Sequence, residues 1–151
     1  MLSKTVVHAV RALMALAESN HEFRGTSAVA DETDSPRNYL GKLLQQLARH
    51  GLVESQKGFG GGFRLARDPA EISLYDVMGA IEDTGRWSAC ILGRQMCSDS
   101  NPCPVHAQWA PVRDAYLNVL RNTKITDLVL GAGGSAVGPF RASKERFDQG
   151  G

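Results

Sequence analysis

The change of hydrophobic period at Gly51 constrains the fold of this chain more than any other feature. Four leucines before it keep the spacing of one helical face: Leu40, Leu43, Leu44 and Leu47. After it, residues 52–66 place a run of glycines between an apolar start and the alternating stretch FRLA. This pattern predicts a β-hairpin with a flexible tip. Gly51 is then the left-handed residue that ends the preceding helix.

Two further helices are expected ahead of that one. Apolar side chains recur at helical spacing over residues 3–19, and Thr26 or Ser27 can cap a short helix that follows. Ser35 as N-cap, with Pro36 at the first helical position, then signals the start of the leucine-bearing helix. Two short helices joined by a turn form a helix-turn-helix, and a hairpin directly after them gives the winged-helix order.

Beyond the hairpin, the chain is predicted to be helical outside one polar stretch. Ser73, with Asp76 three residues later, is a capping-box variant that starts a helix. A seam suited to helix packing, with spacings of three, four and three, is formed by Trp109, Val112, Tyr116 and Val119. Because a winged helix usually reads a two-fold symmetric site as a dimer, we expect this seam to bind a second subunit rather than the chain's own core. Pro111 either starts the regular part of this helix or bends it.

The predicted fold class is mostly α with a small β-hairpin, namely a winged helix-turn-helix domain plus a dimerisation helix. We assign the DNA-binding domain to residues 1–83 and a cysteine-rich, cluster-binding loop to 84–106. The dimerisation helix and a short C-terminal helix follow at 107–130, and the glycine-rich segment 131–151 is expected to be a disordered tail.

The composition excludes several classes of protein. A formal net charge of +1 means that any DNA-binding surface must be local. No apolar run is long enough to span a membrane, and the N-terminal pattern is not that of a secretory signal, so we expect a cytoplasmic protein. No nucleophile–base pair or cofactor loop appears, so enzymatic activity is not expected.

The residues expected to contact DNA lie on the helix at 35–50 and on the hairpin. Recognition helices read base edges mainly from their N-terminal residues, where Arg can pair with guanine and Asn with adenine. The hairpin adds cations next to glycines, whose backbone can approach a phosphate closely. The candidate DNA-binding residues are Ser35, Arg37, Asn38, Tyr39, Lys42, Lys57 and Arg64.

All three cysteines lie in one polar stretch, CILGRQMCSDSNPCPVH, at the spacing C-x6-C-x5-C-x2-H. Thiolates and imidazole suit Zn²⁺ or an iron–sulfur cluster, and the long gaps favour the cluster. The candidate ligands are Cys90, Cys97, Cys103 and His106, whose ring we expect to turn back toward Cys103. An odd number of cysteines argues against a disulfide framework. The alternatives are a structural zinc site, or free thiols used in redox sensing or partner binding.

At these motifs the chain resembles the winged-helix repressor family typified by the iron–sulfur regulator IscR and the nitric oxide sensor NsrR. The likeness covers about residues 1–130 and rests on LSKTVVHAVRALMALA, SPRNYLGKLLQQLARHGLV, KGFGGGFRLAR, ISLYDVMGAIE and the three-cysteine loop. The resemblance implies a homodimer that binds double-stranded operator DNA as a repressor. It also implies an iron–sulfur cluster on Cys90, Cys97 and Cys103, with 2Fe–2S favoured over 4Fe–4S and with His106 at the place of a histidine ligand. Redox state, nitric oxide or iron–sulfur supply would then control DNA binding.

Three features depart from the family pattern. The first cysteine gap is one residue longer than that of IscR. Val7 stands where other sensors take a carboxylate from the first helix of the partner subunit, and His8 beside it is the less favoured alternative donor. Gly41 replaces an acidic residue that IscR uses in operator choice, so the target sequences are not expected to carry over.

Overall fold

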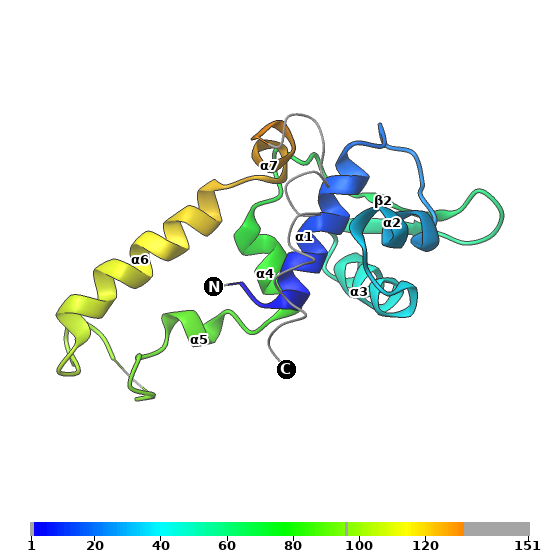
Figure 1. The fold of residues 1–151 in the computed structure, drawn as a ribbon. Helices are drawn as coiled ribbons and strands as arrows, with labels where there is room; N and C mark the ends of the chain where they lie inside the picture. Colours follow the sequence, from blue (N-terminus) through cyan, green and yellow to red (C-terminus); the bar gives the residue numbers. More distant parts are fainter. Residues whose placement is uncertain (1, 96, 132–151) are drawn as a thin grey trace, which may run out of the picture.

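Seven helices and one two-stranded hairpin make up the described part of the computed structural model, which comprises residues 2–95 and 97–131 (Figure 1). In chain order they are α1 (Lys4–Ala17), α2 (Thr26–Thr33), α3 (Arg37–Arg49), β1 (Val53–Gln56), β2 (Gly62–Leu65), α4 (Leu74–Ile81), α5 (Gly85–Ser88), α6 (His106–Asn122) and α7 (Ile125–Gly131). This order confirms the predicted fold class. None of the helices in these two ranges has the length and hydrophobicity needed to span a bilayer.

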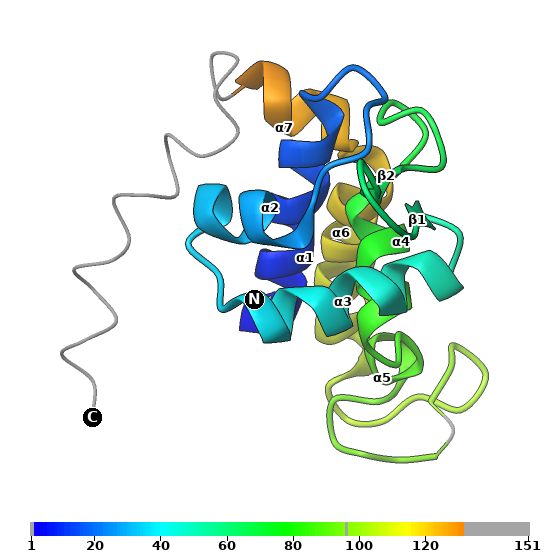
Figure 2. The same cartoon turned by 90° about the vertical axis from the view of Figure 1, so that its right-hand side faces the viewer.

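The helix α1 lies at the centre of the domain, and α2 and α3 pack against it (Figure 2). Its start is capped by Ser3, whose side chain accepts a hydrogen bond from the Val6 N–H at 3.2 Å. All four leucines of the predicted α3 stripe are buried, so the spacing identified the core face of that helix correctly. The opposite, polar face of α3 is consequently exposed.

The starts of α2 and α3 differ from the prediction by one or two residues. Gly25, and not Thr26 or Ser27, occupies the N-cap position of α2, and Pro36, and not Ser35, occupies that of α3. Neither cap position contributes a side-chain hydrogen bond. Ser35 is buried in the turn between the two helices instead. Its hydroxyl forms hydrogen bonds with a side chain of α1 and with one at the end of α2.

The hairpin follows α3 as predicted, and it is fixed to the body of the domain. Gly51 has a φ of +74°, which is the left-handed helix end that the sequence predicts. The strands β1 and β2 pair antiparallel, with Val53 opposite Leu65. Arg24, in the segment after α1, exchanges two backbone hydrogen bonds of 2.8 Å with Phe63 of β2. This extra bridge holds the base of the wing against α1.

Residues 72–76 start α4 and also contact the chain at the start of α7. The capping box is confirmed, because the Asp76 N–H donates to the Ser73 hydroxyl and the Ser73 N–H donates to the Asp76 carboxylate. Caps of this kind contribute about 1 kcal/mol. The Ile125 N–H then donates to the Ile72 carbonyl at 2.9 Å, and α7 packs back onto α1. The predicted tail lies outside the described residues, apart from Gly131, which ends α7.

The helix α6 leaves the body of the domain and carries the cysteine-rich loop at its far end, on the opposite side of the molecule from the hairpin (Figure 1). Its inner side contributes Leu117 and Leu120 to the core. The short helix α5, which the sequence did not predict, packs on α6 through Trp87 and Tyr116, whose ring centroids are 4.8 Å apart.

The predicted seam on α6 is divided between two environments. Tyr116 is half-buried against the chain's own core, whereas Val112 and Val119 are each 58% exposed. Pro111 lies inside the helix, since α6 already begins at His106. Within the described residues, the part of the seam that is exposed to a second molecule is therefore the flank that carries the two valines.

Candidate metal centre and DNA-facing surface

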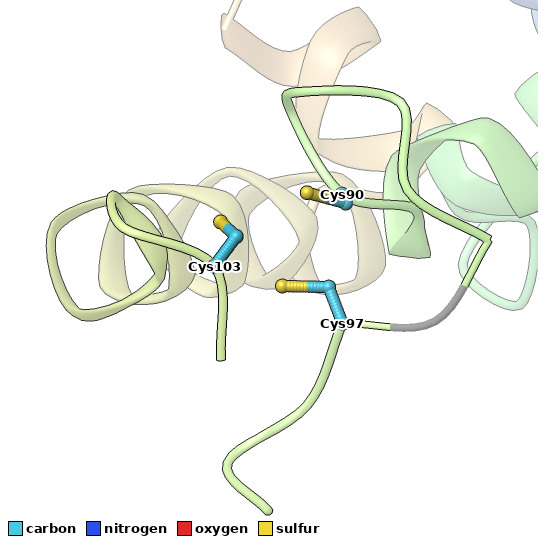
Figure 3. Close-up of side chains that lie close together, drawn as sticks. All are labelled: Cys90, Cys97 and Cys103. Carbon is cyan, nitrogen blue, oxygen red and sulfur yellow. The ribbon is translucent and has the colours of Figure 1, made fainter. Parts of the chain in front are cut away.

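The three cysteine sulfurs converge in space although twelve residues separate the first cysteine from the last. Cys90 follows α5, Cys103 precedes α6, and Cys97 lies in the loop between them. All three Sγ atoms lie within 4.8 Å of one another, and Figure 3 shows them pointing toward a common centre. Cys90 and Cys103 are buried and Cys97 is half-buried, so the group is shielded without being closed off. The sequence-predicted cysteine ligands are thus brought together.

Local hydrogen bonds fold the loop around this centre. A turn after Cys90 closes through Gly93, whose N–H donates to the Cys90 carbonyl at 2.9 Å and whose φ is +76°. The Arg94 guanidinium then donates to the Pro102 carbonyl and to the Asn101 side chain, both at 3.3 Å. These two bonds tie the first half of the loop to the second and draw the segments that carry the cysteines together.

His106 contacts the group through Cys97 rather than through Cys103. Its Nδ1 lies 3.1 Å from the Cys97 Sγ, and its Nε2 lies 3.0 Å from the Asp99 Oδ1. With its proton on Nε2, a neutral ring would donate to Asp99 and leave the Nδ1 lone pair facing the Cys97 Sγ. Metal-binding histidines are oriented in this way by an outer carboxylate. The imidazole is only 7% exposed, which limits alternative orientations.

The thiols differ in acidity. The pKa of Cys90 is lowered to about 7, chiefly because the Arg94 backbone N–H donates to its sulfur, with further help from the Leu92 N–H. Cys97 also receives a pKa-lowering backbone bond, from Cys103, but burial and the neighbouring thiols outweigh it and raise its pKa. Of Cys90 and Cys97, Cys90 is therefore the thiol that ionises at the lower pH, which favours binding of a cation.

The donor set fits a thiophilic metal group. Three converging sulfurs suit iron–sulfur clusters or Zn²⁺ better than oxygen-seeking ions, and the imidazole nitrogen of His106 lies beside one of them, that of Cys97. A tetrahedral zinc ion with Zn–S bonds of about 2.3 Å would hold its sulfurs about 3.8 Å apart. The triad, within 4.8 Å throughout, is compact enough for this alternative as well.

His8, the other predicted nitrogen donor, lies elsewhere in the chain. Its Nδ1 is 2.8 Å from the Oγ of Ser35, and its ring meets the Tyr39 ring edge-on at 5.5 Å. Thr33 donates a further hydrogen bond of 3.1 Å to the Ser35 hydroxyl. His8 thus joins α1 to the helix-turn-helix, and the Ser35 hydroxyl is buried rather than turned outward to DNA.

Most of the other predicted DNA contacts share the exposed face of α3. Asn38 and Lys42 are exposed, Tyr39 is at the margin of exposure, and Arg37 is exposed but pairs with Asp31 of α2 at 3.1 Å. All of these except Tyr39 border an open hollow of about 530 Å³, which is lined by Thr26, Ser27, Arg37, Asn38, Gly41, Lys42 and Gln45. Gln45 was not among the predicted DNA contacts, although its position one helical turn beyond Lys42 places it on the same face.

The two cationic side chains of the hairpin differ in their contacts with the rest of the protein. Lys57 is exposed at the tip. Arg64 forms an ion pair with Glu54 across the hairpin, donates to the His21 carbonyl at 3.4 Å, and lies over the Phe23 ring at 4.3 Å. These interactions hold the guanidinium at the base of the wing.

Comparison with known proteins agrees with this architecture. The profile of the Rrf2 family, described as an iron-dependent transcriptional regulator, matches residues 2–131. The chain is 33% identical to the HTH-type transcriptional regulator NsrR of Shouchella clausii, over 82% of this chain and 84% of that protein. It is 30% identical to IscR of Photorhabdus laumondii, over 81% and 74%. The structure of CymR, the global cysteine regulator of B. subtilis, has the same fold, with a TM-score of 0.71 at 24% identity over 87% of this chain and 97% of that one.

Proposed function

The chain belongs to the Rrf2 family of transcriptional regulators, and on that premise we propose that it is a repressor whose operator binding is controlled by an iron–sulfur cluster. The family consists of DNA-binding regulators and not of enzymes. The observation that carries the proposal is the convergence of three cysteine sulfurs within 4.8 Å of one another, in a loop outside the hydrophobic core. The family's description as iron-dependent supports iron as the partner of these thiols.

In this proposal Cys90, Cys97 and Cys103 hold the cluster and the Nδ1 of His106 completes the set. Asp99 fixes the ring through Nε2. We favour a 2Fe–2S cluster because mixed cysteine–histidine ligation is established for that type. When bound, the cluster supplies iron that reacts with oxidants or with nitric oxide. The cluster can be lost in this way and can be assembled again on the same residues.

The fold offers a path from the loop to the DNA-facing helix. The loop is continuous with α6, and α6 packs against α4. The carbonyl of Ala80, near the end of α4, accepts a hydrogen bond of 3.0 Å from the Gln46 side chain of α3. An ordered loop would hold α6 in one position relative to α4, and that position would be transmitted to α3.

In a homodimer, a shift of α6 would change the distance between the two copies of α3. The flank of α6 that carries Val112 and Val119 is exposed and apolar, and a second copy would bury it. Two recognition helices then have to match half-sites about one turn of DNA apart. A change in the packing of α6 alters that separation, so the loop controls operator binding through geometry and does not have to touch DNA.

The competing assignment is a regulator with a structural zinc ion, which the compact triad also accommodates. A further alternative keeps the same fold but uses free thiols as the sensor. The test is DNA footprinting with anaerobically purified protein, before and after oxidative removal of iron. A change in protection that reconstitution with iron and sulfide reverses supports the cluster. Protection that depends on zinc, or on a thiol reductant alone, contradicts it.

A further inference from the structure

The tip of the wing presents one aromatic ring directly to solvent. Phe59 is 110% exposed, the most of any large hydrophobic side chain among the described residues. Single exposed apolar residues are common and usually need no explanation. Phe59 differs because it lies in the loop that joins β1 to β2, and this hairpin lies on the side of the molecule where α2 and α3 lie, away from α6 (Figure 1).

The backbone on both sides of Phe59 forms a defined turn. Phe59 lies between Gly58 and Gly60, whose φ values are +92° and +74°, a conformation that side-chain-bearing residues rarely adopt. A Cβ on Gly61 would collide with the Gln56 carbonyl, and one on Gly62 with that of Arg24. The tip is therefore a closed turn built on an anchored hairpin, which projects the ring away from the protein.

The tip also lacks a side chain that is well suited to reading base edges. Residues 57–62 carry only two side chains, the cation of Lys57 and the ring of Phe59, since the other four residues are glycines. Arg64, the nearest guanidinium, is held by Glu54 and by the His21 carbonyl. Lys57 suits a phosphate, which leaves the apolar ring as the remaining means of contact with the bases.

We propose that Phe59 is a DNA wedge: its ring enters a groove of the operator beside the site read by α3 and partly unstacks one base step. Apolar side chains, phenylalanine among them, act in this way in proteins that bend DNA. Pyrimidine–purine steps unstack most easily, so the ring selects such a step through the cost of deforming it. The inference rests on the proposed binding of duplex DNA, but not on the cluster.

The test compares three variants on one short duplex that the wild-type protein has selected from a randomised pool. Phe59→Ala should weaken binding about tenfold, the effect expected from losing one aromatic–base contact. Its salt dependence should be unchanged, because an uncharged ring releases no counterions. Lys57→Ala is the matched control and should flatten the salt slope by about one unit. Phe59→Leu should retain part of the affinity, because leucine is also used as a wedge.

Two further readouts separate a wedge from a passive contact. Energy transfer between dyes at the duplex ends should report a bend that Phe59→Ala reduces and Lys57→Ala retains. A second selection with Phe59→Ala should lose the preference for a pyrimidine–purine step at one position. Wild-type affinity, bend and step preference in Phe59→Ala would overturn the inference and leave DNA binding intact. Failure of the wild-type protein to select any sequence would refute DNA recognition itself, and the wedge with it.

Discussion

The Nδ1 of His106 lies 3.1 Å from the Sγ of Cys97, nine residues earlier in the chain. The other ring nitrogen, Nε2, lies 3.0 Å from the Asp99 Oδ1. This arrangement distinguishes His106 from His8, whose Nδ1 is engaged with Ser35 in the helix-turn-helix. The predictions below start from that difference.

Replacement of His106 should destabilise the cluster without removing its cysteine ligands. His106→Ala should leave the cluster labile, and His106→Cys should retain one with a lower reduction potential, since nitrogen ligation raises the potential. Pulsed electron resonance of the reduced protein should detect a nitrogen coupling that His106→Ala abolishes. A coupling that persists in His106→Ala but disappears in His8→Ala would reverse the assignment.

Asp99 should act on the tautomer of His106 even in the metal-free protein. Nitrogen NMR of the imidazole should find the proton on Nε2 in the wild type, and Asp99→Ala should give a mixture of the two tautomers. The same change should shorten the lifetime of the reconstituted cluster about tenfold, the lower end of the range for outer partners of metal ligands. Asp114→Ala, which removes a carboxylate from the exposed part of α6, is the control and should change neither property. A single unchanged tautomer in Asp99→Ala would remove its orienting role.

Acid should destabilise the domain partly through His8. Its pKa is lowered below the ordinary value of 6.5, first by burial and then by the charge of Arg11, with Asp34 opposing. The unfolded chain therefore binds a proton before the folded one does, and the stability contributed by neutral His8 is lost as pH falls below about 6.5. Urea unfolding of metal-free protein between pH 5 and 8 should show this loss. It should be smaller in His8→Gln, and an identical pH dependence in the two proteins would contradict the account.

Arg37 should read a base once it is released from Asp31. Arg37→Ala should weaken specific binding by about 1–3 kcal/mol and relax the preference at one base position. Asp31→Asn removes the competing carboxylate and should raise affinity modestly, since exposed pairs of this kind contribute at most about 1 kcal/mol. Salt titrations and site selection with both variants provide the measurement. An equal loss on all sequences in Arg37→Ala would assign that side chain to phosphate instead.

The features that the sequence predicted well depend on neighbours within a few residues. The left-handed Gly51 and the capping box of Ser73 and Asp76 are of this kind, because each is determined by one turn of chain. The burial of Ser35 could not be predicted, since it depends on His8, 27 residues away on another helix. The engagement of Arg64 requires the strand register of the hairpin, which places Glu54 directly opposite it.

The candidate metal centre also has features that the sequence predicted and features that it could not predict. The confinement of all cysteines to one loop with a nearby histidine identified the candidate ligands from the sequence. Which sulfur the histidine meets, and that Asp99 holds its far nitrogen, depend on the path of the loop between Cys97 and α6. Spacing along the chain does not specify that path.

The most direct test of the central proposal is the composition of protein purified without oxygen, measured as iron, acid-labile sulfide and zinc per chain together with the visible spectrum. The account predicts a brown protein with about two iron and two sulfide per chain, as a 2Fe–2S cluster requires. Cys97→Ala should be colourless, with an unchanged far-ultraviolet circular dichroism spectrum, because Cys97 lies outside the hydrophobic core. A colourless wild-type protein that contains one zinc per chain, or no metal with three free thiols, would contradict the account.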